Sequence, residues 1–147
     1  MKHFVTILAA ISFTTPAVAS SQDVYHDVEY VSGKAGLEKK MKGTLVIDDS
    51  TITLHDRSSH SVLLSLSMST IKEISASNEV NTGSIGRKLL LGVFASHEEE
   101  FVTITTETAT DAEGIVFKVG HKASAGVVAK IHYRLKRYLA KDSVATR

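Results

Sequence analysis

Histidine is the side chain of this sequence best suited to acid–base chemistry near neutral pH, because the chain has seven histidines and no cysteine. His55, Asp56 and His60 come closest to a chemical motif, since a carboxylate beside two imidazoles can hold a divalent metal or act as a general base. The two histidines lack the i, i+4 helical spacing of zinc peptidases. Solvated turn residues are the simpler interpretation, and a small metal-dependent or hydrolytic enzyme using these turn histidines is the alternative function.

Motifs that activate a serine or cradle a phosphate are missing from the sequence. No Gly-x-Ser-x-Gly elbow follows a strand, so the abundant serines are interpreted as outward-facing strand positions. The run Gly83-Ser84-Ile85-Gly86-Arg87-Lys88 has glycines and cations, but it lacks the spacing and the final hydroxyl residue of a nucleotide-binding loop. We therefore predict no catalytic residue, no metal ligand and no cofactor.

Two groups of charged residues are candidates for binding ions or charged partners. His97-Glu98-Glu99-Glu100 offers carboxylates to a divalent cation, but a solvated hairpin entrance is the preferred interpretation, because neighbouring residues point in different directions. The second group is a basic stripe at helical spacing, formed by Lys130, Arg134, Arg137 and Lys141. Such a stripe usually solvates the outer face of a helix, and an anionic partner is the alternative.

The overall charge argues against nucleic acid as a partner. The 17 basic and 16 acidic side chains leave a formal net charge of +1, so no global field attracts a polyanion. Aromatic residues, which stack on single-stranded bases, accompany the basic stripe only at Tyr133 and Tyr138. The absence of cysteine also excludes disulfides, so the fold must be stable on core packing alone.

Residues 1–19 have the three parts of a secretory signal peptide in the right order. Lys2 and His3 give a positive start, a short apolar run follows, and Ala17-Val18-Ala19 offers small residues to a signal peptidase. The apolar run is too short for a permanent membrane anchor. We predict export to the periplasm or the exterior, with cleavage after Ala19.

Period-two alternation dominates the middle of the chain and indicates half-buried β-strands. It spans residues 24–31, 41–47, 52–54, 62–67, 101–106 and 115–119, with Val24, Val28 and Tyr30 sharing one face. From 123 to 141 the apolar spacing becomes helical, with Ser124 as a candidate cap, and 142–147 is predicted to be a tail. The expected core is Leu45, Ile47, Ile52, Leu54, Leu64, Leu66, Ile104, Phe117, Ile131 and Leu135.

One segment has neither periodicity. Within the segment from Gly83 to Phe94, the residues Leu89-Leu90-Leu91 and Val93-Phe94 form a run that is apolar on all sides, so this run must be buried within this protein or against something else. Burial inside the chain is one interpretation. The other is a partner surface, whose residues would be Ile85, Arg87, Lys88, Leu90, Leu91, Val93 and Phe94.

The order of these elements resembles small bacterial pleckstrin-homology-like (PH-like) domains. The similarity is carried by Gly43-Thr44-Leu45-Val46-Ile47-Asp48-Asp49 with its following strands, and by the hairpin from Phe101 to Val119 before the helix. It implies a mainly β domain over 20–141: a partly open barrel of two orthogonal antiparallel sheets, capped by one C-terminal helix. Phosphoinositide-binding relatives carry basic residues in the first hairpin turn. Here Asp48-Asp49-Ser50 occupies that turn, so phosphoinositide binding is not expected.

Taken together, the sequence favours an exported, non-enzymatic binding or interaction module. The candidate partners are a second copy of the chain, another protein and a membrane surface, in that order.

Overall fold

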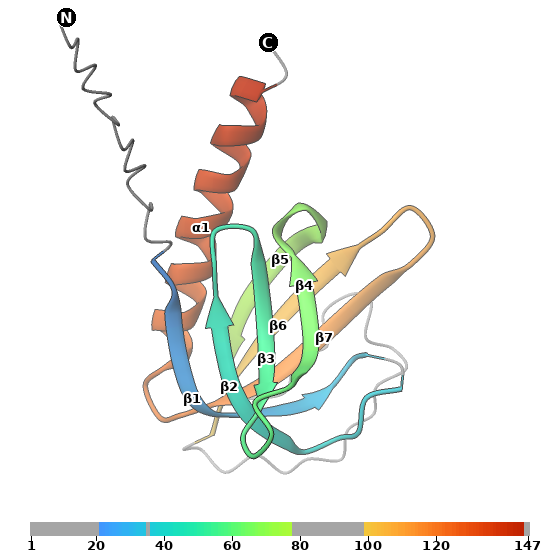
Figure 1. The fold of residues 1–147 in the computed structure, drawn as a ribbon, viewed down its shortest axis with the longest axis vertical. Helices are drawn as coiled ribbons and strands as arrows, with labels where there is room; N and C mark the ends of the chain where they lie inside the picture. The colour runs from blue at the N-terminus through green and yellow to red at the C-terminus, as the bar shows by residue number, and fades with distance from the viewer. Residues whose placement is uncertain (1–20, 35, 78–98, 146–147) are drawn as a thin grey trace, which may run out of the picture.

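Alternating apolar residues build an antiparallel sheet, and a single helix lies beside it (Figure 1). The computed structural model describes residues 21–34, 36–77 and 99–145. The strands are β1 (Asp23–Ser32), β2 (Met41–Ile47), β3 (Thr51–Asp56), β4 (Val62–Ser67), β5 (Ile71–Ser77), β6 (Glu100–Glu107) and β7 (Ala112–Val119). A short 3₁₀ turn, η1 (Met68–Thr70), joins β4 to β5, and helix α1 (Ser124–Ala145) ends the described chain.

The prediction of a mainly β, partly open barrel with one C-terminal helix is confirmed. Seven antiparallel strands follow the order β4-β3-β2-β1-β7-β6-β5, and β4 and β5 are the two edges. The two halves of the barrel form one continuous hydrogen-bonded sheet, because β1 pairs with β2 on one side and with β7 on the other. Strand β1 therefore joins the two hairpin groups that the sequence pattern distinguishes.

A β-bulge in β1 changes which residues face the core. Tyr25 pairs with Leu45 and Val28 with Gly43, so β1 has one residue more than β2 between the two pairs. Asp27 adopts a φ of 56° at this bulge. As a result Tyr25 packs against the core, whereas Val24 is 47% exposed. Grouping Val24 with Val28 and Tyr30 was wrong, because strict alternation does not allow for an inserted residue.

The core forms where the two halves of the sheet face each other beneath the helix. Nine of the ten expected core residues are buried, and the tenth, Leu135, is partly buried and packs against the others. The rings of Tyr30 and Phe117 meet edge to face, with centroids 6.3 Å apart. Apolar side chains thus fill the interior of the barrel.

Helix α1 packs mainly against β5, β6, η1 and β2 through its first half. Its buried residues are Ser124, Val127, Ile131 and Arg134. The N-terminus is held by a carboxylate from β6: Glu100 accepts hydrogen bonds from the backbone N–H groups of Lys122 and Ser124, at 2.7 and 3.0 Å. The helix continues to Ala145, four residues beyond its expected end, and this last part projects past the sheet (Figure 1).

Shortening Ile131 tests whether the helix closes the barrel. Ile131 is fully buried in the core, so Ile131→Ala should lower the free energy of unfolding by about 2–5 kcal/mol. Leu139→Ala is the matched control, because Leu139 is 56% exposed on the same helix and should change stability by less than about 0.5 kcal/mol. Chemical denaturation measures both. Equal effects would mean that the helix does not seal the core.

Candidate functional site

The basic stripe of α1 binds two aspartates of the same chain. Arg134 donates to Asp23, at the start of β1, from Nε at 3.2 Å and Nη2 at 2.8 Å. Its Nη1 donates to Asp49, in the β2–β3 turn, at 2.6 Å. Lys130 adds a contact of 3.1 Å to Asp23, and the stripe therefore connects the helix to two distant points of the sheet.

The distal half of the stripe binds the β2–β3 turn. Lys141 lies 3.1 Å from an oxygen of Asp49, and Arg137 lies 3.9 Å from the same oxygen. Arg134 is only 3% exposed, so the expectation that the stripe solvates an outer face was wrong at its central residue. The physical reason is charge pairing: the two carboxylates compensate the guanidinium for the loss of water.

This pairing shifts the proton affinity of all three groups. The hydrogen bonds from Arg134 hold the pKa of Asp23 below its ordinary value, with a further contribution from Lys130. Arg134 and then Lys141 lower the pKa of Asp49 in the same way. The two carboxylates in turn raise the pKa of Arg134, which stays charged throughout the physiological range. The network, here called the arginine clamp (Asp23, Asp49, Arg134), is fully ionised at neutral pH.

A second polar group lies on the outer face of β1, β2 and β3. It lines a hollow of about 620 Å³, here called the histidine hollow. Three imidazoles reach it from different segments: His26 from the β1 bulge, His55 from β3 and His60 from the following turn. Other lining residues include Gln22, Asp27, Thr44, Asp48, Thr53 and Arg57.

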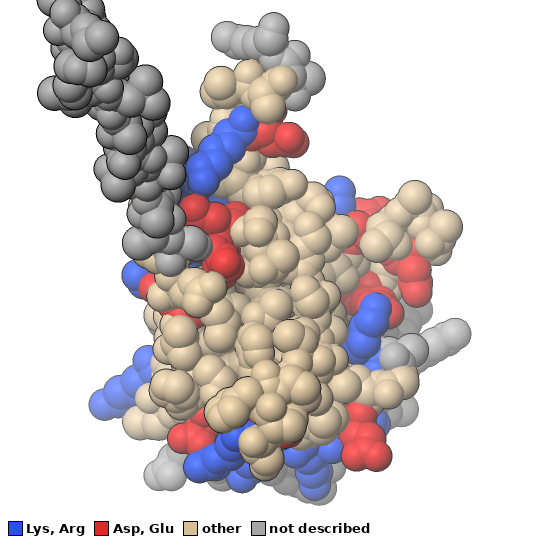
Figure 2. Space-filling model, in the orientation of Figure 1, with Lys and Arg blue, Asp and Glu red and all other residues tan. Residues whose placement is uncertain are grey.

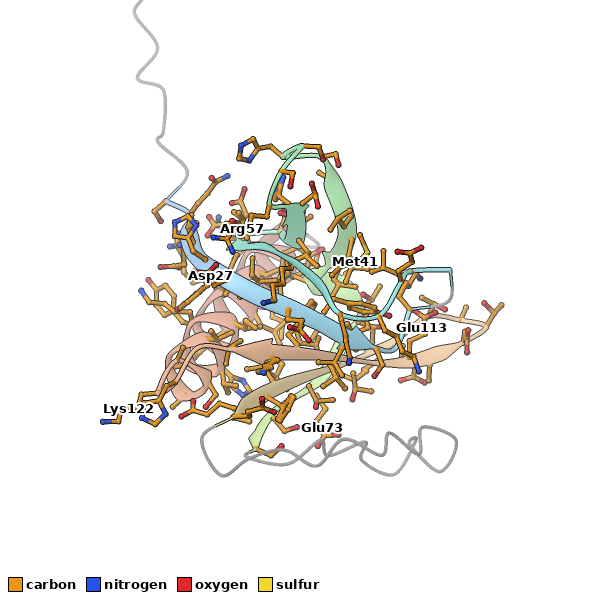
Figure 3. The ribbon with its side chains drawn as sticks, turned by 90° about the horizontal axis from the view of Figure 1, so that it is seen from below. Asp27, Met41, Arg57, Glu73, Glu113 and Lys122 are labelled. Carbon is orange, nitrogen blue, oxygen red and sulfur yellow. The ribbon has the colours of Figure 1, made fainter. Side chains whose placement is uncertain are left out.

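Two of the three imidazoles of the hollow, those of His26 and His55, are oriented by their neighbours. His26 Nδ1 lies 3.3 Å from the hydroxyl of Thr44. His55 contacts the Thr53 hydroxyl through Nε2 at 3.1 Å and the His60 carbonyl through Nδ1 at 3.2 Å. Beside them Arg57 meets Asp27 at 2.9 Å, and both side chains are about two-thirds exposed (Figure 3). The hollow thus offers hydrogen-bonding groups and one solvated ion pair.

The carboxylate of Asp56 is used to build the turn after β3. It accepts hydrogen bonds from the backbone N–H groups of Ser58 and Ser59, at 3.0 and 2.7 Å, and from the Ser59 hydroxyl at 2.9 Å. These bonds lower the pKa of Asp56, the largest effect coming from the Ser59 backbone. The structure therefore brings His55 and His60 together in one hollow, with Asp56 occupied in the turn between them.

The described part of the acidic run has structural contacts. Glu99 pairs with Lys118 of β7. Glu100 accepts the two backbone hydrogen bonds at the helix N-terminus, and its pKa is lowered first by the side chain of Ser124 and then by these backbone bonds. Within residues 21–34, 36–77 and 99–145, no three histidines or carboxylates are placed to hold a metal ion. His97 and Glu98 lie outside the described residues.

Two further predictions fall outside the part of the chain that the structure describes. The predicted signal peptide, 1–19, is one of them. The other is the partner surface of Ile85, Arg87, Lys88, Leu90, Leu91, Val93 and Phe94.

Sequence reasoning missed the partners of the basic stripe and the outline of the hollow. Asp23 and Asp49 are 111 and 85 residues from Arg134, and no local pattern joins them. His26 faces the same side as His55 only because the β1 bulge sets the register. A bulge with a non-glycine residue at positive φ leaves little trace in the sequence, although a polar pair such as His26-Asp27 inside an alternating strand is a useful signal.

Comparison with known proteins adds no family. No family model matches the chain, and no curated protein matches it at a significant level. In the residues that the structure describes, no helix is both long and apolar enough to cross a bilayer.

Removing the central cation tests the arginine clamp. Arg134→Ala leaves two carboxylates without their main partner, and it should lower the free energy of unfolding by about 2–3 kcal/mol. Arg137→Ala is the matched control, because this arginine is exposed and lies 3.9 Å from Asp49; we expect a loss below about 0.5 kcal/mol. Denaturant titration of both variants measures the difference. Similar losses would show that Arg134 contributes no more than a surface charge.

The clamp also predicts how stability depends on acid. The folded-state pKa values of Asp23 and Asp49 lie below those of the unfolded chain, so their contribution is complete above the unfolded value of about 4 and is lost as pH falls through the folded values. Thermal unfolding between about pH 6 and pH 2 should show this loss. Asp49→Asn should be less stable at neutral pH and should lose less stability on acidification. An unchanged acid profile in that variant would contradict the assignment.

Proposed function

We propose that this protein is an exported, non-enzymatic binding module with a PH-like fold, and that it binds a polar ligand in the histidine hollow. The observation that carries the proposal is the convergence of His26, His55 and His60 from three segments on one open hollow of about 620 Å³. The volume of the hollow lies within the range of small-molecule sites, and its lining of mainly polar residues suits a polar ligand.

The filled interior supports a ligand site on the outside of the barrel. Leu45, Ile47 and Leu54 are completely buried on the inner face of β2 and β3. The outer face of the same strands carries Thr44, Thr53 and His55. The inner face of β2 and β3 therefore stabilises the fold, and the outer face is available for binding.

The chemistry of the hollow favours an uncharged ligand with hydrogen-bonding groups, because the lining holds two carboxylates, Asp27 and Asp48, and one guanidinium, Arg57. Neutral imidazole offers one donor and one acceptor, and protonated imidazole offers two donors. Arg57 is held by a single exposed carboxylate, Asp27, so its remaining N–H groups can donate to hydroxyl or carbonyl oxygens of a ligand. At neutral pH the centre of this face carries few formal charges, and the Lys, Arg, Asp and Glu side chains lie toward its margins (Figure 2).

The use of the carboxylates supports binding over catalysis. Asp56 closes a turn, Glu100 holds the start of α1, and Asp23 and Asp49 hold Arg134. A general base must be able to give up its structural contacts or to work within them. The two carboxylates that line the hollow are engaged as well, because Asp27 pairs with Arg57 and Asp48 accepts hydrogen bonds from Gln22 and from the backbone N–H of Asp49. The imidazoles remain as recognition groups.

Export and the PH-like assignment belong to the same proposal. The order of the strands and the closing helix agree with the resemblance, and residues 1–19 supply the signal segment. Phosphoinositides are poor candidates because the β2–β3 turn carries Asp48 and Asp49, and Asp49 is itself held by Arg134. We therefore place the ligand site in the histidine hollow and not at the β2–β3 turn, where phosphoinositide-binding proteins of this fold carry basic residues.

Nuclear magnetic resonance of the protein exported from a full-length gene tests the proposal. N-terminal sequencing of that protein should begin at Ser20. A neutral trisaccharide should then shift the resonances of His26 and His55 in a saturable way, whereas a hexaglutamate peptide and a hexalysine peptide should shift them less. His26→Ala should weaken the binding at least fivefold. The helical His132→Ala is the control and should bind as the wild type does.

Two results would overturn the binding proposal. One is the absence of any saturable shift at the hollow with all three probes. The other is a response to zinc alone at His55 and His60, accompanied by hydrolysis of an ester that Asp56→Asn abolishes, because this would favour the small metal-dependent enzyme.

A further inference from the structure

We propose that the free edge of β4 pairs with β4 of a second copy of this chain, which makes an antiparallel, two-fold symmetric dimer. The proposal rests on sheet topology and on the sequence of the edge strand, and it does not depend on the histidine hollow.

The backbone of Ser65 points away from the sheet. Met68 donates its N–H to the carbonyl of Ser50, and the next pairs along β3 and β4 are Thr51 with Ser67, and Ile52 with Leu66. In an antiparallel ladder, residues alternate between facing the neighbouring strand and facing away from it. Leu66 and Leu64 therefore bond to β3, whereas Ser65 presents its N–H and C=O to the open edge.

Strand β4 carries its β-bulge at Leu63, and the stretch that follows, Leu64 to Ser67, lacks the other features that protect an edge. From Ser61 to Ile71 the sequence contains no charged residue, no proline and no glycine. The other edge, β5, carries Lys72 and Glu73 and has α1 packed against it. Natural edge strands avoid pairing through charges, proline or cover. The stretch from Leu64 to Ser67 is an uncovered template for one more strand within the described part of the molecule.

An identical strand fits this edge well. With Ser65 opposite Ser65 of the second copy, the two residues exchange both backbone hydrogen bonds. Leu64 then faces Leu66 of the second copy on the inner side, and the serine hydroxyls meet on the outer side. No charge is buried, and the two-fold axis closes the assembly at two chains. A contact this small predicts a weak dimer, with a dissociation constant of about 0.1 mM.

Charge pairing at position 65 provides a sharp test. Ser65→Lys and Ser65→Glu each place like charges face to face across the axis, so each variant alone should dissociate at least tenfold more readily than the wild type. An equimolar mixture of the two should associate again, because Lys then faces Glu. Ser58→Lys adds the same charge in an exposed turn away from the edge and should associate as the wild type does. Sedimentation velocity over a range of concentrations measures all four.

Thermal unfolding of each variant separates loss of pairing from loss of folding. Both position 65 variants should melt within a few degrees of the wild type at concentrations where all are monomeric. The proposal is overturned if the wild type remains monomeric at about 1 mM. It is also overturned if folded Ser65→Lys associates as well as the wild type, or if the mixture associates no better than its components. The hollow can still bind its ligand in each of these cases.

Discussion

The arrangement of this domain depends on one arginine that is held between two aspartates. Arg134 lies near the middle of α1, and its partners lie at the start of β1 and in the β2–β3 turn. Apolar contacts by Val127 and Ile131 seat the helix on the sheet, but such contacts are not directional. The guanidinium accepts only a fixed geometry, so it sets where the helix lies relative to the first two strands. Burial of an unpaired guanidinium would destabilise the fold. Because Arg134 is paired with both aspartates, its burial instead fixes the position of the helix.

A single inserted residue in β1 changes which side chains reach the surface. The bulge at His26 and Asp27 moves Tyr25 inward, turns Val24 outward and places His26 beside Thr44. Gly43, opposite the bulge, approaches β3 so closely that a Cβ would lie 2.1 Å from the carbonyl oxygen of His55. Any side chain larger than hydrogen would push β2 and β3 apart at this point. The small residue and the bulge together allow the three strands to bring their imidazoles to one hollow.

The two proposed surfaces use different properties of the same sheet. The histidine hollow uses side chains on the outer face, while the β4 edge uses backbone groups in the plane of the sheet. They adjoin each other through His60 and Val62, so a dimer formed at the edge would bring two hollows onto one extended surface. Two weak sites on one assembly can bind a repetitive ligand more strongly than either site alone.

The sequence by itself determined the strands, the closing helix and most of the core, because each depends on a local period. Leu45, Ile47, Ile52 and Leu54 alternate, and Val127 and Ile131 recur one turn apart, so burial of their faces requires little more than the pattern. It also singled out the basic stripe and the turn histidines, but not their surroundings. Only the tertiary structure decided that Arg134 is buried between Asp23 and Asp49, that Asp56 closes a turn, and that His26 joins His55. These contacts join residues that are far apart in the chain, or they depend on the β1 bulge or on a local turn. The local spacing of apolar residues does not predict contacts of these kinds.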